Sequence, residues 1–438
     1  MKKPNRKPTF FLLSAGVIAA GIVTGNGLSA NQTAEAATEA AVVGHAAVDI
    51  AAVNEEPSAS VLADSSAQAS TAENPGAEAV TEAADTTPFM RLQQMNFLSA
   101  TTGWMVRAGN AQTQKQPLSL LVTQNGSRSW TEHSLPGKYA AGLGLSGADT
   151  GWAVVYDGSK QTQGVVSYAR ARVLHTADGG KSWQTQWSGA GDFTDSFPPQ
   201  NNLAVTGSDS AYAIVGDRLL FTRDGRVWST AVFGQAGFVP EHLSFSDAKN
   251  GWVVGTMPPF VGAVDAKAVV VLHTADGGRT WKKQFTAGPT DEENSDSSTL
   301  RSAAIDFADA QNGFMLTDDI SMMAGDLYRT TDGGKKWTNV YAKLRSHRPT
   351  LVGLSFIDGQ KGWIYASPGA GPIDGGLMVT RDGGNSFRSD PDAGYDLSAA
   401  QYFASGQGYA TGSTAYDQDY LSRTRDGGDT WTVVYPAK

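Results

Sequence analysis

Hydrophobic positions in residues 89–438 recur in short runs that are typical of β-strands. The runs are rich in β-branched and aromatic side chains, and Gly, Asp and Asn bound them on both sides. No stretch of this region sustains the spacing of an amphipathic helix. Within 302–341, for example, the pattern predicts four successive strands at 302–307, 313–317, 326–330 and 336–341. The sequence therefore predicts an all-β domain.

Three markers recur seven times in constant order through the same region. The most distinctive is Thr-x-Asp-Gly-Gly-x-(Ser/Thr)-Trp. Its clearer copies begin at Thr176, Thr274, Thr330, Thr380 and Thr424, and its divergent copies begin at Thr123 and Thr222. A small residue followed by an aromatic one precedes each copy: Gly103-Trp104, Gly151-Trp152, Ala211-Tyr212, Gly251-Trp252, Gly313-Phe314, Gly362-Trp363 and Gly408-Tyr409. An apolar residue comes six positions earlier still, or five in the last copy: Phe97, Leu145, Val205, Phe245, Phe307, Phe356 and Phe403.

Seven copies over 89–438 give about 50 residues each, which is the length of a four-stranded propeller blade. We therefore predict a seven-bladed β-propeller of four-stranded antiparallel blades. The chain is expected to enter at an inner strand near Leu92 and to end at an outer strand, 430–435. Each blade is then continuous in sequence. The ring should close by packing of the first blade against the seventh, without a shared strand.

The Asp-Gly-Gly segment is predicted to be a structural turn between the third and fourth strands. An Asp side chain can accept hydrogen bonds from amides of its own turn, and Gly permits positive φ. The final Trp is expected to pack into its blade or against the neighbouring one. Six aspartates hold this position, and the symmetry of the fold spreads them around the ring: Asp178, Asp224, Asp276, Asp332, Asp382 and Asp426. They cannot converge as an acid/base pair, and we predict no catalytic residue.

The repeated motif resembles the Asp-box, or bacterial neuraminidase repeat. This repeat occurs in sialidases, xyloglucan-active glycoside hydrolases, sortilin-type receptors and photosystem II stability/assembly factors. Seven blades with a Gly-Trp second strand most resemble the photosystem II assembly-factor type, over the whole of 89–438. The resemblance implies the propeller fold, but the motif is structural in these families and says little about function. Sialidases of this fold need an Arg-Ile-Pro motif, which is absent here, where the sole Arg-Pro is Arg348-Pro349.

The N-terminal residues predict export. Residues 1–30 combine a basic start, an apolar run at 10–23 and small residues, which is the pattern of a signal peptide cleaved after Ala30 or Ala36. A retained anchor is the alternative. Residues 31–88 contain ten acidic residues, no Lys or Arg and no Phe, Trp or Tyr, which predicts a disordered Ala/Glu-rich linker. We expect a secreted or cell-surface protein with no integral membrane domain after signal cleavage.

The amino-acid composition excludes several kinds of functional site. The chain has no Cys, which excludes disulfides, thiolate metal sites and a Cys nucleophile. A formal net charge of −9 argues against nucleic-acid binding by bulk charge. His175 and His273 hold equivalent positions in different blades, which argues against a shared metal. His133, His242 and His347 share no ligand spacing. We predict no metal and no cofactor. The expected protein is a monomer that binds a protein or a cell-envelope glycan, and an Asp-box glycoside hydrolase of sialidase or xyloglucanase type is the alternative.

Loop lengths indicate which face of the disc binds a ligand. Turns between first and second strands share one face with the Asp-boxes and are short. The longer predicted loops, at 156–172, 189–201, 257–267, 286–300, 342–349 and 367–376, fall on the opposite face. Variable loops on a repeated scaffold usually carry binding. Candidate ligand-binding residues on that face offer aromatic stacking or positive charge: Phe193, Phe197, Phe260, Tyr395, Tyr416, Arg170, Arg172, Arg345, His347 and Arg348.

Overall fold

The computed structural model describes residues 90–109, 118–162, 165–194, 201–257, 268–287, 300–319, 324–341, 350–367, 376–390, 396–414 and 418–436. The predicted signal peptide (1–30) and linker (31–88) lie outside the described residues. Within these ranges every regular element is a β-strand. No helix long and apolar enough to cross a membrane is found in the described part of the chain.

The strands form seven antiparallel sheets, each built from four strands that are consecutive in the chain. The first two blades are β1 (Met90–Phe97), β2 (Gly103–Gly109), β3 (Leu118–Thr123), β4 (Thr131–Leu135) and β5 (Tyr139–Leu145), β6 (Gly151–Thr162), β7 (Val165–Thr176), β8 (Gln184–Thr194). The third and fourth are β9 (Leu203–Val205), β10 (Ala211–Val215), β11 (Arg218–Thr222), β12 (Trp228–Val232) and β13 (Val239–Phe245), β14 (Gly251–Met257), β15 (Ala268–Thr274), β16 (Lys282–Ala287). The fifth is β17 (Leu300–Phe307), β18 (Gly313–Asp319), β19 (Ala324–Thr330), β20 (Thr338–Tyr341). The sixth and seventh are β21 (Thr350–Phe356), β22 (Gly362–Ser367), β23 (Gly376–Thr380), β24 (Arg388–Asp390) and β25 (Asp396–Tyr402), β26 (Gly408–Ser413), β27 (Asp419–Thr424), β28 (Thr432–Tyr435).

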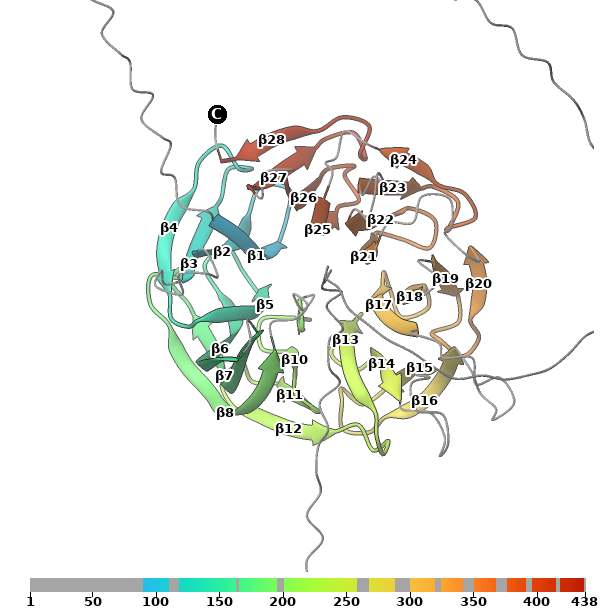
Figure 1. Ribbon diagram of the computed structural model, residues 1–438, viewed down its shortest axis with the longest axis horizontal. Helices are drawn as coiled ribbons and strands as arrows, with labels where there is room; N and C mark the ends of the chain where they lie inside the picture. The colour runs from blue at the N-terminus through green and yellow to red at the C-terminus, as the bar shows by residue number, and fades with distance from the viewer. Residues whose placement is uncertain are drawn as a thin grey trace, which may run out of the picture. The chain divides into compact units, whose positions relative to one another are not determined.

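The seven sheets are arranged as the blades of a propeller (Figure 1). The first strand of a blade, such as β1, β13 or β25, lies nearest the centre, and the fourth strand lies at the rim. The predicted fold, an all-β propeller of seven four-stranded antiparallel blades, is confirmed. Among the described residues, every sheet consists of strands that are consecutive in the chain.

The first and seventh blades meet through side chains. The backbone N–H of Phe97 donates to Oε1 of Gln401 at 2.8 Å, and Nε2 of Gln401 donates to the Phe97 carbonyl at 2.7 Å. The Phe97 ring stacks on Tyr409 with centroids 3.8 Å apart. The Tyr409 hydroxyl in turn donates to the Ala100 carbonyl at 2.8 Å. The ring therefore closes by packing and side-chain hydrogen bonds, as predicted.

The same stacking contact recurs at other blade interfaces. An aromatic residue at the start of one blade's second strand stacks on the last inner-strand residue of the next blade: Tyr212 on Phe245, Trp252 on Phe307, Phe314 on Phe356 and Trp363 on Tyr402. The last pair corrects the sequence analysis, which took Phe403 as the marker. Tyr402 pairs with Gly408 in the register in which Phe97 pairs with Gly103, and Phe403 follows the strand. The apolar criterion chose Phe over the equivalent Tyr.

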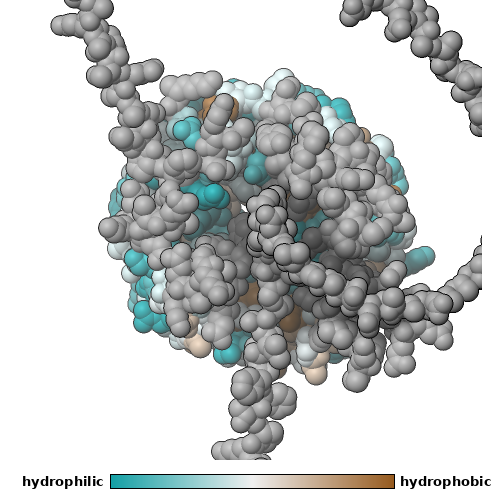
Figure 2. Space-filling model, in the orientation of Figure 1, coloured by the Kyte–Doolittle hydropathy of each residue, from teal (hydrophilic) through white to brown (hydrophobic). Residues whose placement is uncertain are grey.

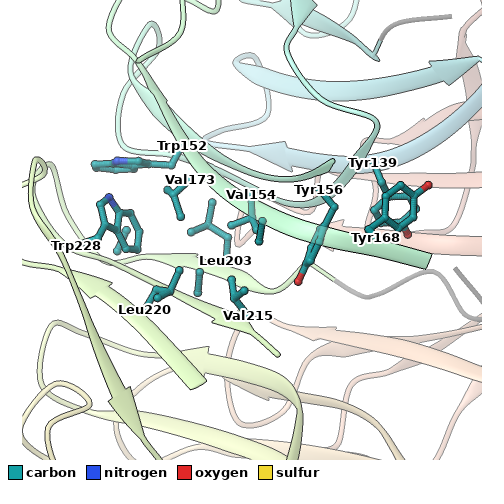
Figure 3. Close-up of a cluster of buried hydrophobic side chains, with 14 residues drawn as sticks. Tyr139, Trp152, Val154, Tyr156, Tyr168, Val173, Leu203, Val215, Leu220 and Trp228 are labelled. Carbon is teal, nitrogen blue, oxygen red and sulfur yellow. The ribbon is translucent and has the colours of Figure 1, made fainter. Parts of the chain in front are cut away.

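Large apolar side chains fill the space between blades. Figure 3 shows the cluster between the second and third blades, with Trp152 beside Trp228 at one end and Tyr139 close to Tyr168 at the other. The Trp152 side chain is fully buried. Burying one such side chain contributes roughly 1.5–3 kcal/mol. Because each blade shares a cluster of this kind with its neighbour, apolar packing is the main force that holds the ring together.

The second blade is longer than predicted. Residues 156–172 and 189–201 were expected to be loops. In the structure β6 and β7 pair continuously from Gly151 opposite Thr176 to Thr162 opposite Val165, and β8 extends to Thr194. Side chains support the extension at its base, where the Tyr156 and Tyr168 rings lie 6.3 Å apart. The loop prediction for 156–172 was therefore wrong over most of its length, and that for 189–201 was wrong over 189–194.

Candidate functional site: the central channel

One face of the disc consists of turns that are fixed to one another. In each blade the first Gly of the Asp-box, or its equivalent, donates its N–H to a carbonyl of the turn between the first and second strands. The seven described bonds, 2.6–2.9 Å long, are donated by Gly126, Gly179, Gly225, Gly277, Gly333, Gly383 and Gly427. We call this side the Asp-box face and the opposite side the loop face. The breaks between the described ranges fall at connections on the loop face.

The Asp-box carboxylates are occupied within their own turns. Asp276 accepts hydrogen bonds from the N–H groups of Arg279 and Thr280 and from the hydroxyls of Thr274 and Thr280. The Thr280 hydroxyl is the largest cause that holds the pKa of Asp276 below its usual range. Hydrogen bonds from Ser182 likewise lower the pKa of Asp178 to about 2.

The leading Thr of the motif is a second centre of the turn, which the sequence analysis overlooked. In the fourth blade the Thr274 hydroxyl donates to Asp276 and accepts from the N–H of Gly278 at 2.9 Å. The same two contacts recur around Thr176, Thr330, Thr380 and Thr424. The invariant spacing of Thr and Asp in five copies was the signal that could have revealed this pairing.

The inner strands carry a repeated irregularity. Six of the seven described inner strands have a β-bulge at the same place, three to five residues before the strand ends. In β13, for example, the bulge lies between Pro240 and His242. A bulge adds a residue on one strand and redirects the neighbouring side chains. These bulges change which side chains face the centre of the ring.

Polar side chains beyond the bulges join the inner strands into a belt. A residue seven positions before the second-strand marker accepts a hydrogen bond from the backbone N–H of the next blade's inner strand. Asp306, for instance, accepts from Phe356 at 2.7 Å through Oδ2. Four other inner strands make the equivalent bond through neutral side chains: Asn96, Ser244, Ser355 and Gln401. Between the second and third blades Asn201 replaces this contact, since its amide pairs with both the N–H and the carbonyl of Leu143.

Two adjoining cavities lie inside this belt. The first, of about 170 Å³, is bounded by Gln93, Gln94 and Asn96 and by residues of β25. The second, of about 360 Å³, is bounded by inner-strand residues of the fourth to seventh blades. They share four lining residues: Asn201, Tyr365, Ala400 and Gln401. We call them together the channel site.

On the face that Figure 2 displays, the residues that are coloured are mostly hydrophilic or of intermediate hydropathy.

Asp306 is the one carboxylate among the described residues that line the larger cavity. Burial raises its pKa to about 6, and the hydrogen bond from the Phe356 N–H opposes that rise. A carboxylate has about four acceptor positions, so one backbone donor leaves capacity for a ligand. Asp306 therefore changes charge close to neutral pH, unlike the neutral side chains at the equivalent positions.

His242 faces the same cavity from the neighbouring blade. Its Nδ1 is buried and has no hydrogen-bond partner among the described residues. Burial lowers the pKa of His242, an effect that the adjacent Glu241 partly opposes, so the imidazole is neutral at pH 7. Glu241 itself accepts hydrogen bonds from the Thr256 and Ser302 hydroxyls. This nitrogen has almost no exposed surface, so it is an unpaired atom of the fold that a ligand in the cavity does not reach.

Tyr365 reaches the channel because an inner-strand residue is small. A Cβ added at Gly353 would lie 2.2 Å from the Tyr365 hydroxyl oxygen, so only Gly leaves room for the ring. Tyr365 belongs to β22, a second strand, but it lines both cavities. Gly353 therefore places an aromatic side chain at the channel from one strand further out.

The predicted ligand-binding residues are only partly placed. Arg172 forms an ion pair with Asp157, with Nε 2.6 Å from Oδ2, and it also donates to the Pro136 carbonyl. Arg170 is exposed on β7. Phe193 lies in β8, and its side chain is outside the description. The remaining candidates lie outside the described residues: Phe197, Phe260, Arg345, His347, Arg348, Tyr395 and Tyr416. Arg170 and Arg172, whose side chains the structure describes, do not line the channel site.

Comparisons with known proteins show the fold alone. The β-propeller domain of the Trilobed protease from Pyrococcus furiosus, which has an open velcro topology, matches with a TM-score of 0.50 at 9% identity, over 80% of this chain and 100% of that one. YCF48 from Cyanidioschyzon merolae matches with a TM-score of 0.48 at 16% identity, over 76% of this chain and 95% of that one. The GH74 xyloglucanase from Xanthomonas campestris matches with a TM-score of 0.45 at 14% identity, over 78% of this chain and 60% of that one. No protein-family profile and no curated protein sequence matches the chain.

Proposed function

We propose that this protein is an exported, non-catalytic β-propeller that binds a protein or a cell-envelope glycan through the channel site and the loop face. The observation that carries the proposal is that two sets of polar side chains lie in different places and make different contacts. The Asp-box carboxylates are committed to turns on one face, as the contacts of Asp276 illustrate. Amide, hydroxyl and aromatic side chains gather instead at the channel. This mixture is typical of a recognition site.

The sequence resemblance to photosystem II assembly-factor propellers supports a binding role and does not require photosynthesis. The leader and the acidic linker support a secreted or cell-surface location, with the linker as a spacer. Fractionation with mass analysis of the N-terminus tests the location. We expect the protein outside the cytoplasmic membrane, and recovery from the cytosol with Met1 retained would contradict export.

A glycoside hydrolase of the Asp-box group is the second candidate, and Asp306 is the observation that favours it. A carboxyl whose pKa is about 6 has the property of a general acid. Glycosidases of this type pair that acid with a second carboxylate. The described lining of the larger cavity contains one carboxylate, so the second would have to come from residues outside the description. Binding without hydrolysis is therefore the better-supported proposal.

The test of function combines a glycan array with affinity capture by the purified propeller. A captured protein or glycan is then measured against two double variants. Arg345→Ala with Arg348→Ala alters the loop face, and Lys249→Ala with Lys361→Ala is the matched change on the Asp-box face. We expect only the first to weaken binding. If only the Lys249→Ala, Lys361→Ala variant weakened binding, the ligand would bind at the Asp-box face and the proposal would be wrong. Hydrolysis of a bound glycan would show that the protein is an enzyme.

A further inference from the structure

The larger cavity of the channel site has negative charge without a counter-charge. Of the residues that line it in the described part of the chain, Asp306 can carry a negative charge and none is Lys or Arg. The equivalent positions in four other blades are Asn, Ser, Ser and Gln, and each makes the same backbone hydrogen bond. The belt therefore does not need a carboxylate in the fifth blade. Its charge is explained by a ligand rather than by the fold.

The remaining walls suit a hydroxylated cation. Tyr365 supplies an aromatic side chain, which can attract a cation. Asn201, Ser355 and Gln401 supply amide and hydroxyl groups, which can form hydrogen bonds with the hydroxyls of a sugar. His242 lines the cavity with a neutral imidazole, which does not repel a positive charge. The volume of about 360 Å³ lies within the range of roughly 300–1,000 Å³ that is usual for small-ligand pockets.

We propose that this cavity binds the primary ammonium group of an amino sugar, with Asp306 as its carboxylate partner and the amide and hydroxyl side chains of the wall as contacts for the sugar. The inference rests on the proposed binding function and names the ligand class of the same site. An ammonium group has three donors, which match the free acceptor positions of Asp306. A glycan from which acetyl groups have been removed presents such a group, whereas an N-acetylated glycan does not.

Proton linkage gives the proposal a distinctive signature. The titratable side chains that line the cavity with Asp306 are His242 from β13 and Tyr365 from β22, whereas the Tyr402 hydroxyl lies beside Gly427 on the Asp-box face. Glu241 and Arg301 act on His242 from outside the cavity, and Arg301 is paired with Asp318 at 2.8 Å. A cation stabilises the ionised form of Asp306, so binding must release a proton near pH 6. Because the pKa of Asp306 is about 6, affinity at pH 5 should be about tenfold below that at pH 7.

The experiment measures glucosamine binding to the whole protein by calorimetry at pH 7 and pH 5. Glucose, N-acetylglucosamine and free lysine are compared under the same conditions. We expect glucosamine to bind at least tenfold more tightly than any of the three. Equal binding of glucose or N-acetylglucosamine would overturn the role of the ammonium group, and equal binding of lysine would overturn the role of the sugar.

Two variants separate charge from structure. Asp306→Asn keeps an acceptor for the Phe356 N–H and removes the charge, so it should weaken glucosamine binding at least tenfold and abolish its dependence on pH. Ser244→Ala is the matched control, because Ser244 makes the equivalent bond to Phe307 and does not line the cavity. Wild-type affinity in Asp306→Asn would refute the site. Partner binding on the array or by capture, without glucosamine binding, would refute this inference alone and leave the proposed function standing.

Discussion

The link between Gln401 and Phe97 should contribute measurably to closure of the ring. In Gln401→Ala the N–H and the carbonyl of Phe97 both lose their side-chain partner. A buried polar group left unpaired costs about 1–3 kcal/mol. Water from the adjoining cavities can replace part of each bond, since Gln401 lines both of them. We therefore expect a total loss of about 1–3 kcal/mol in the free energy of unfolding.

The assay is urea unfolding followed by tryptophan fluorescence, with midpoint and slope compared between variants. Asn201→Ala is a matched test, because Asn201 makes the same two-bond contact with Leu143 between the second and third blades. Gln418→Ala, at an exposed position, should lie within about 0.5 kcal/mol of wild type. If Gln401→Ala were as stable as Gln418→Ala, the amide bridge would not be part of what closes the ring.

Gln401→Glu gives the same link a dependence on pH. An ionised Glu can accept from the Phe97 N–H but cannot donate to the Phe97 carbonyl, whereas a protonated Glu can do both. Its pKa in the folded protein should therefore lie above the ordinary value of about 4.3. A raised pKa means that stability is present below the unfolded value and is lost as the pH rises through the folded one. Gln401→Glu should approach wild-type stability near pH 4 and fall behind it at pH 7.

Three further predictions concern the Asp-box face. Asp276→Ala should cost about 1–3 kcal/mol and lower the melting temperature by a few degrees, without changing ligand affinity of the folded protein; lost binding at unchanged stability would contradict the structural role. Hydrogen bonds hold the pKa of Asp178 and of Asp426 at about 2, below the ordinary 3.8, so their stabilisation is present above pH 4 and is lost as the pH falls toward 2. Melting curves between pH 5 and 2 should show this loss, and Asp178→Asn should reduce its slope. Gly277→Ala should destabilise by more than about 1 kcal/mol, because Gly277 has a φ of +70° and a Cβ there would lie 2.6 Å from the Ala248 carbonyl oxygen; Gly207→Ala, with open space around the added Cβ, should be nearly neutral in the same melting assay.

The fold was predictable because its determinants are local and repeated. A turn such as Thr274 to Trp281 contains its own hydrogen-bond partners, so the motif can be read without knowledge of the rest of the chain. Closure without a shared strand was predictable because the repeat begins at an inner strand near Leu92 and ends at an outer strand. The residues that make the closing contact were not predicted. The error at Phe403 arose where two adjacent aromatic residues could both serve as the marker, and only strand register distinguishes them.

The channel site was not predictable in the same way, because its residues come from positions that the repeat does not conserve in type. Asp306 and Gln401 hold equivalent places in the belt, yet one is an acid and the other an amide. A weak signal was present in the fifth blade, where Asp306 directly precedes the marker Phe307, but in the seventh blade the choice of Phe403 as the marker hid the equivalent place of Gln401. The pKa of Asp306 is raised because residues of other blades bury its carboxyl group, and the sequence does not show which residues these are. The extension of β6 and β7 was missed because Asp157-Gly158 has the sequence of a turn, although the strand pairing continues past it.

The way in which each blade is assembled determines where the backbone can be cut. Because every sheet is complete within one stretch of the chain, new ends placed between any two blades would leave all twenty-eight strands with their own partners. A circular permutant that begins in the connection between β12 and β13, and that joins the present end of the seventh blade to the start of the first, should therefore fold into the same ring. The same property lets a whole blade be duplicated or deleted as a cassette. Gain and loss of such cassettes would change the diameter of the ring, and with it the size of the ligand that the centre admits.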